Sequence, residues 1–170
     1  MKAVVIGDGA AGLAAVKSFR KYDKTSPITV ISKEGGEAYS RVLLPYVLRG
    51  KLSYDKLFLP FAKEFGRLGV EYIEGEAVSL DTAGDTLSLA DGTKLSYGSL
   101  LVASGSSALW PPVKGITQPG IYTCGRAVTL TRSLRSSEKD GKFWLSAPVL
   151  YRSRPHGPRA LWNLTSRWSR

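Results

Sequence analysis

The chain has 170 residues, of which 43% are hydrophobic and 22% are charged, a composition typical of a folded domain with one core of ordinary size. It has no apolar run long enough to predict a transmembrane helix and no secretory signal pattern at its start, so we expect a cytoplasmic protein. The single cysteine, Cys124, excludes an internal disulfide framework and a paired-cysteine redox centre.

The net charge of +10 is unevenly distributed. Residues 143–170 contain five arginines and no acidic residue, and therefore carry half of it. Residues 1–142 show no basic stripe with interleaved aromatic residues, the pattern typical of nucleic-acid binding. We therefore expect no nucleic-acid partner, and neither a metal site nor a role for the only histidine, His156.

The chain opens with the pattern of a β-α-β unit. Residues 3–6 form an apolar run that predicts a buried parallel strand, residues 10–21 have helical character, and residues 27–31 predict a second strand. In the helix, Leu13 and Val16 are expected to face the core. The cationic side chains expected to point to water are Lys17, Arg20 and Lys21.

The segment Gly7-Asp8-Gly9-Ala10-Ala11-Gly12 lies between the first strand and the helix, which is the context of a dinucleotide-binding fingerprint. Gly7 permits the tight turn, Gly9 lets the backbone approach a pyrophosphate, and Gly12 lets the helix pack closely on the strand. The start of the helix offers N–H groups and a partial positive charge to phosphates. A purely structural glycine turn is the alternative interpretation.

Glu34 follows the second predicted strand, at about 20 residues beyond the last glycine, where a carboxylate can accept hydrogen bonds from ribose hydroxyls. That acid commonly lies directly at the strand end, where this chain has Ser32. A solvated loop glutamate is therefore the alternative for Glu34.

A long connection follows the β-α-β unit. Residues 35–59 predict short helical pieces, and the spacing of Phe61, Phe65 and Leu68 predicts a short helix that ends at Gly69.

Two more strands and a hairpin complete the predicted elements. Residues 70–73 predict a strand and residues 99–103 predict a buried one. Residues 77–81 and 86–89 alternate in polarity and predict a hairpin around a polar turn at residues 82–85.

Four segments together resemble the FAD-binding part of the pyridine nucleotide-disulfide oxidoreductase superfamily, in particular rubredoxin and ferredoxin reductases and the flavin domain of the nitrite reductase large subunit. The segments are the glycine turn, Tyr39-Ser40-Arg41-Val42-Leu43-Leu44-Pro45 with Leu48-Arg49-Gly50, Gly75-Glu76-Ala77-Val78, and Leu101-Val102-Ala103-Ser104-Gly105-Ser106. The resemblance covers about residues 1–142.

The resemblance implies an α/β, Rossmann-like FAD-binding domain with a parallel sheet, helices on both faces and a β-hairpin insertion, incomplete in this chain. It implies FAD as cofactor, NAD(P)H as co-substrate, and a rubredoxin- or ferredoxin-like protein or a linked reductase module as electron acceptor. Arg41 is implied to neutralise the FAD pyrophosphate. The residues implied to bind the cofactor are Gly7, Gly9, Ala10, Ala11, Gly12, Glu34, Arg41, Pro45, Ala77, Val78, Ala103, Ser104 and Gly105.

No catalytic residue is carried over from the resemblance. Some relatives place a lysine near the flavin at the position of Tyr46. Electrons are expected to leave the flavin directly, because this chain lacks a cysteine pair.

Residues 143–170 depart from the family, which continues here with a strand and a second glycine turn that opens the NAD(P)-binding domain. If one nucleotide is restored after the Lys142 codon, the following codons can be read in a shifted frame. From Lys142 onward, that frame can encode KVLVVGAGLIS, which has the pattern of a strand followed by the start of such a turn. We therefore divide the chain into a partial FAD-binding domain, residues 1–142, and an out-of-frame tail, residues 143–170. A genuine basic tail that binds a membrane or an acidic partner is the alternative.

The resulting expectation is an FAD-dependent NAD(P)H oxidoreductase present as an N-terminal fragment, in which nicotinamide delivers hydride to the flavin. The alternatives are a catalytically inactive remnant of a reductase and a nucleotide-binding module without turnover.

Overall fold

A computed structural model describes residues 2–60, 65–107, 112, 114–116, 118, 123, 125–131 and, for the backbone, 143–148 and 163–168. Cys124, His156 and residues 61–64 of the helix predicted before Gly69 lie outside the described residues. The chain divides into two compact units, Met1–Ser107 and Ala108–Arg170. None of the helices in the described part of the chain has the length and apolar composition that a bilayer span requires.

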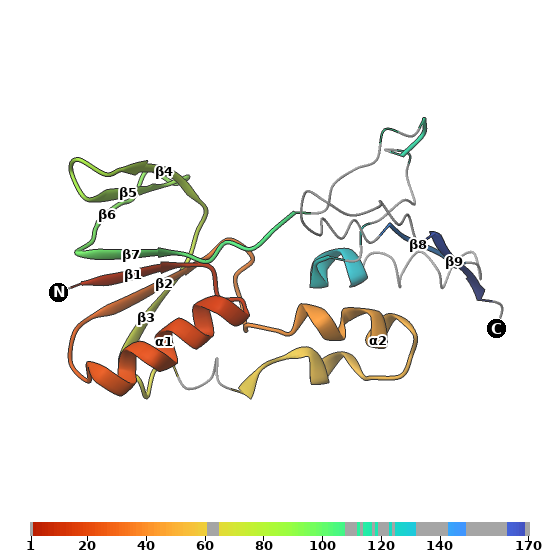
Figure 1. The fold of residues 1–170 in the computed structure, drawn as a ribbon, viewed down its shortest axis with the longest axis horizontal. Helices are drawn as coiled ribbons and strands as arrows, with labels where there is room; N and C mark the ends of the chain where they lie inside the picture. Colours follow the sequence, from red (N-terminus) through yellow and green to blue (C-terminus); the bar gives the residue numbers. More distant parts are fainter. Residues whose placement is uncertain are drawn as a thin grey trace, which may run out of the picture. The chain divides into compact units, whose positions relative to one another are not determined.

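A four-stranded parallel sheet with the strand order β3-β2-β1-β7 forms the centre of the first unit (Figure 1). The strands are β1 (Ala3–Ile6), β2 (Ile28–Ser32), β3 (Val70–Glu74) and β7 (Ser99–Val102). In the register, Val5 of β1 lies opposite Val30 of β2 on one side and Leu101 of β7 on the other. Because all four strands run in the same direction, their carboxyl ends meet at one edge of the sheet.

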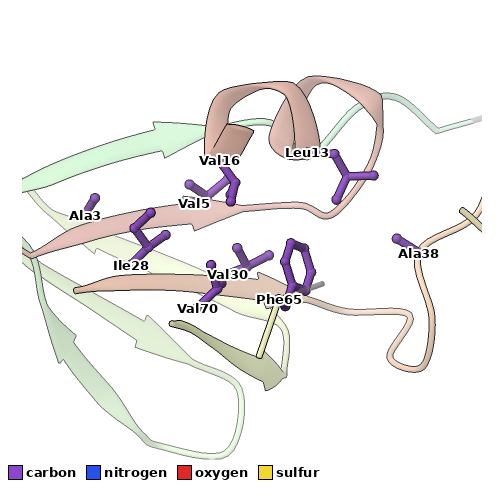
Figure 2. Close-up of a cluster of buried hydrophobic side chains, with 9 residues drawn as sticks. All are labelled: Ala3, Val5, Leu13, Val16, Ile28, Val30, Ala38, Phe65 and Val70. Atoms are coloured by element: carbon purple, nitrogen blue, oxygen red, sulfur yellow. The ribbon is translucent and has the colours of Figure 1, made fainter. Parts of the chain in front are cut away.

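Helix α1 (Ala10–Tyr22) covers one face of this sheet. Leu13 and Val16 are 6% and 1% exposed, as the sequence predicts, and they pack with side chains from three strands (Figure 2). Each such burial contributes about 1.5–3 kcal/mol, which fixes the helix on the sheet. The buried cluster consists of Ala3, Val5, Leu13, Val16, Ile28, Val30, Ala38, Phe65 and Val70.

A three-stranded antiparallel sheet, ordered β4-β5-β6, packs on the opposite face. Its strands are β4 (Ala77–Asp81), β5 (Thr86–Leu89) and β6 (Lys94–Ser96). Leu87 and Leu89 pack against Val4 and Ile31, the residues that alternate away from α1. The sequence predicts helices on both faces; among the described residues, this sheet occupies the second face. The hairpin formed by β4 and β5 has the predicted bounds. Strand β6 was not predicted, because it is too short to show an alternating pattern in the sequence.

Short helical pieces form the connection after β2, as predicted. They are η1 (Arg41–Leu43), α2 (Leu44–Leu48) and η2 (Tyr54–Leu57). Leu44 and Leu57 are fully buried, and a single bridge joins Tyr39 to Phe58. The connection is therefore anchored by a few apolar side chains rather than by a regular element.

The second unit contains a helical segment at residues 127–131 and two strands. Leu130 of the helical segment is buried, and its N–H donates to the Arg126 carbonyl. Strands β8 (Phe143–Pro148) and β9 (Asn163–Trp168) form an antiparallel pair.

Strand β7 differs from the prediction of a buried strand over residues 99–103. Leu101 and Val102 are 41% and 61% exposed. The strand ends the sheet order and pairs only with β1 among the described strands. Its apolar sequence predicts a central position, but composition does not reveal which strand lies at an edge.

Arg20 also differs from its prediction, because it is buried and only 7% exposed. Its guanidinium donates through Nε to the Leu68 carbonyl (2.7 Å) and through Nη2 to the Gly69 carbonyl (3.2 Å). Through Nη1 it donates to the carbonyls of Ser26 (2.8 Å) and Asp23 (3.3 Å). Arg20 therefore joins the end of α1 to the segments that lead into β2 and β3.

Basic side chains gather around a hollow at this end of α1, without the interleaved aromatic residues typical of nucleic-acid binding. The cations that line it are Lys17, Arg20, Lys21, Lys24 and Arg67. Four of them recur at helical spacing, a signal that the sequence already carries, and cations near a helix C-terminus are favoured by the helix dipole.

Candidate dinucleotide-binding site

The glycine turn at the end of β1 has a geometry that only glycine permits at two positions. Gly7 has φ +105°, and a Cβ placed there would lie 2.3 Å from the Ala103 carbonyl oxygen. A Cβ at Gly12 would lie 1.9 Å from the Gly7 carbonyl oxygen. The turn, the start of α1 and the end of β7 therefore pack backbone against backbone.

Gly9 differs from these two glycines because, apart from Gly9 and its two chain neighbours, no atom lies within 4 Å of the position that its Cβ would take. It is the N-cap of α1, without a side-chain cap, and the first turn of the helix has no acidic residue. The first intrahelical bond runs from the Leu13 N–H to the Gly9 carbonyl (2.9 Å). The N–H groups of Ala10, Ala11 and Gly12 precede it, so the helix start has donors, positive partial charge and open space for an anion.

The end of β7 lies beside this turn. The Ala103 N–H donates to the Ile6 carbonyl (2.8 Å), and the Gly7 N–H donates to the Ile31 carbonyl (2.8 Å). Ser104 and Gly105, which follow Ala103, are exposed. The structure thus places the glycine turn beside the residues that follow β7, a proximity that could not be predicted from the spacing of residues in the sequence.

Glu34 and Arg41, two residues predicted for separate roles, contact each other. Arg41 Nη2 donates to Glu34 Oε1 (2.5 Å), and the Tyr39 hydroxyl donates to Glu34 Oε2. The Arg41 guanidinium also lies 5.9 Å from the centroid of the Tyr39 ring. The Glu34 side chain is 18% exposed, which does not fit the alternative of a solvated loop glutamate.

The other predicted residues lie farther along the chain. Ala77 packs beneath the sheet with the second apolar cluster, whereas Val78 is 58% exposed. Pro45 is exposed in the first turn of α2. The Gly75 N–H donates to the Ser32 carbonyl (2.9 Å), which ties the start of this segment to the end of β2. The cofactor roles of Ala77, Val78 and Pro45 stay predictions.

One contact at the turn was not predicted. The Tyr72 hydroxyl donates to Asp8 Oδ2 (2.9 Å). Burial, together with the nearby Asp8 and Glu74 carboxylates, raises the pKa of Tyr72 to about 12, although a hydrogen bond from Ser32 opposes the shift. Because Asp8 follows β1 and Tyr72 lies 64 residues away on β3, a strand that does not neighbour β1, no spacing in the sequence indicates their contact.

Comparison with known proteins identifies the class to which this fold and site belong. The family described as pyridine nucleotide-disulphide oxidoreductase matches residues 1–146. The chain therefore belongs to the pyridine nucleotide-disulphide oxidoreductase family. Members of this family bind FAD and take NADH or NADPH as substrate.

Individual relatives support this placement. The chain is 36% identical over 116 residues to the epsilon subunit of NADH-dependent phenylglyoxylate dehydrogenase from Aromatoleum evansii, covering 68% of this chain and 28% of that protein. It is 32% identical over 114 residues to rubredoxin-NAD(+) reductase from Alcanivorax borkumensis, covering 66% and 30%. A ferredoxin reductase from Rhodopseudomonas palustris matches in structure with a TM-score of 0.73 and 27% identity, covering 83% and 35%.

The chain spans about three tenths of the length of the curated relatives that it matches.

Proposed function

We propose that this chain holds FAD at the carboxyl edge of its parallel sheet and forms the FAD-binding part of an NAD(P)H oxidoreductase. The observation that carries the proposal is the open space at Gly9, at a helix start without a side-chain cap or acidic residue. The close contacts at Gly7 and Gly12 support it, because they hold the turn in the shape that a pyrophosphate requires.

The donor set of the described residues fits the chemistry of FAD. The uncapped amides at the start of α1 support binding of the pyrophosphate there, and Arg41, whose guanidinium contacts Glu34, is the cation that we propose to neutralise it. Glu34, oriented by Arg41 and Tyr39, is placed to accept hydrogen bonds from the ribose. When bound, FAD accepts hydride from the nicotinamide and passes electrons to an acceptor, while the protein binds and orients it.

The acceptor that we propose is a small redox protein or a linked reductase module. Support comes from the names of two relatives, which act on rubredoxin and as a ferredoxin reductase.

Titration of the purified full chain with FAD, followed by flavin fluorescence, tests the proposal. Saturable one-to-one binding is the expected result, and bleaching of the bound flavin by NADH would show reduction by this chain alone. FAD binding without bleaching would indicate a nucleotide-binding module without turnover. No binding of FAD by the folded chain would contradict the proposal and favour an inactive remnant.

For residues 143–170 we propose an out-of-frame origin, separately from the function. Support comes from their five arginines without an acidic residue, from the regrouped reading KVLVVGAGLIS, and from the end of the family match at residue 146. Sequencing the genomic locus tests this. An intact reading frame without a glycine turn in the alternative frame would refute it.

A further inference from the structure

The glycine turn carries a negative charge of its own. Asp8 lies between Gly7, where the turn is closely packed, and Gly9, where the space at the start of α1 is open. A pyrophosphate in that space is itself strongly anionic, and two like charges a few ångströms apart repel by an amount that changes affinity severalfold even near a protein surface. The orientation of the Asp8 carboxylate therefore affects what the turn can bind.

Tyr72 determines that orientation in the structure. It lies on β3, which is separated from β1 by β2, and it donates its hydroxyl to Asp8 Oδ2 (2.9 Å) in the turn after β1. The Tyr72 ring stacks on Phe65 at 5.9 Å between centroids, and Ser32 hydrogen-bonds to its hydroxyl. The ring is thus held from two sides, and the hydroxyl is protonated and able to donate at neutral pH.

We propose that Tyr72 is a positioning residue that turns the Asp8 carboxylate toward β3 and away from the space at Gly9 where an anionic phosphate binds. The inference rests on the proposed function, because it concerns the same phosphate site. It assigns Tyr72 no contact with the ligand. Its effect on binding passes entirely through the charge of Asp8.

The variant Tyr72→Phe keeps the ring stacked on Phe65 and removes only the donor. The Asp8 carboxylate is then free to rotate toward the turn, and we expect the affinity for FAD and for inorganic pyrophosphate to fall about tenfold. Asp8→Asn removes the charge, so the double variant Tyr72→Phe/Asp8→Asn should bind as tightly as Asp8→Asn alone. The loss in Tyr72→Phe should also shrink at about 1 M salt, where charges are screened beyond about 3 Å.

Calorimetric titration of the full chain and these variants with FAD and with inorganic pyrophosphate tests the inference. The control is Tyr97→Phe, the same change at a tyrosine whose hydroxyl contacts the Asp81 carbonyl in the three-stranded sheet, which should leave both affinities unchanged. Equal affinities of wild type and Tyr72→Phe would overturn the inference. So would a tenfold loss that persists when Asp8→Asn is added, because a merely structural effect is not rescued by removing the charge.

A further comparison needs no change at Tyr72. Because the wild-type carboxylate already points away, Asp8→Asn alone should change the pyrophosphate affinity by less than about threefold, whereas a gain above tenfold would overturn the inference. If wild type binds neither FAD nor pyrophosphate, the proposed function fails and the inference with it. If wild type binds both and only the variant pattern is wrong, the inference alone fails.

Discussion

The two ends of helix α1 are completed in opposite ways. At its C-terminal end, the Asp23 N–H donates to the Phe19 carbonyl, and the Arg20 guanidinium binds four carbonyls in the segments around it. At its N-terminal end, Gly9 supplies neither a side-chain cap nor any atom to fill the space beside it. The chain itself satisfies one end, and the other is the end at which we propose that a ligand binds. Substitutions at the first should therefore change stability, and substitutions at the second should change affinity.

Gly12→Ala should have the largest effect, because it breaks the structure on which both ends depend. The new methyl group would lie 1.9 Å from the Gly7 carbonyl oxygen, so α1 would have to move away from the turn. We expect a loss of about 3 kcal/mol or more in the free energy of unfolding, measured by urea denaturation. An unchanged unfolding midpoint would contradict the tight packing of this turn.

Arg20→Met should destabilise the chain by about 2–4 kcal/mol, because four carbonyls lose a charged donor in a partly buried position. The matched control is Lys21→Met, on the same turn but exposed, which should change the free energy of unfolding by less than about 0.5 kcal/mol. Similar losses in both variants would show that charge at this end matters rather than the hydrogen bonds of Arg20.

Arg41→Gln should separate affinity from stability at the ligand end. The Arg41 side chain is 45% exposed, so its pairing with Glu34 should contribute less than about 1 kcal/mol to stability. We expect the FAD affinity to fall about tenfold, because a cation beside the pyrophosphate is lost. Lys51→Gln, which removes an exposed lysine, is the control for net charge. Equal losses of affinity in the two variants would argue for a general charge effect.

The last prediction concerns how stability depends on pH in the alkaline range. The folded-state pKa of Tyr72 is raised to about 12 from an ordinary value of 10. The stability that its neutral hydroxyl contributes is therefore fully present below pH 10 and is lost as the pH rises toward 12. Wild type should therefore lose more stability between pH 10 and 12 than Tyr72→Phe does. Parallel pH profiles of the two proteins, measured by urea denaturation, would refute this difference.

The residues that could be predicted from the sequence are those whose roles are local. Residues 3–6 indicate their strand as an apolar run, residues 10–21 indicate their helix, and the glycines between them mark the turn. Arg20 could not be placed, because its partners are carbonyls of the loops after α1 and before β3, and carbonyls carry no sequence signal. The exposure of β7 depends on strand order, which apolar composition does not encode.

The site divides in the same way. Glu34 and Arg41 were each found from their motif, but their direct contact, and the part of Tyr39 in it, required the fold. Tyr72 was missed altogether, because its contact with Asp8 crosses an intervening strand. Sequence patterns thus pointed to the residues proposed to bind the ligand, whereas the contacts among these residues and with Asp8 required the fold.

The FAD affinity of Gly9→Ala tests the central claim most directly. Gly9 has φ −70° and ψ −173°, which alanine adopts readily, and its Cβ would enter open space, so we expect a loss in the free energy of unfolding of no more than about 1 kcal/mol, the usual cost of alanine at an N-cap. We predict that fluorescence titration gives at least tenfold weaker FAD binding for Gly9→Ala, and unchanged binding for Gly66→Ala, another glycine with open space around its Cβ position. Wild-type affinity in a folded Gly9→Ala variant would contradict the assignment of this helix start as the pyrophosphate site.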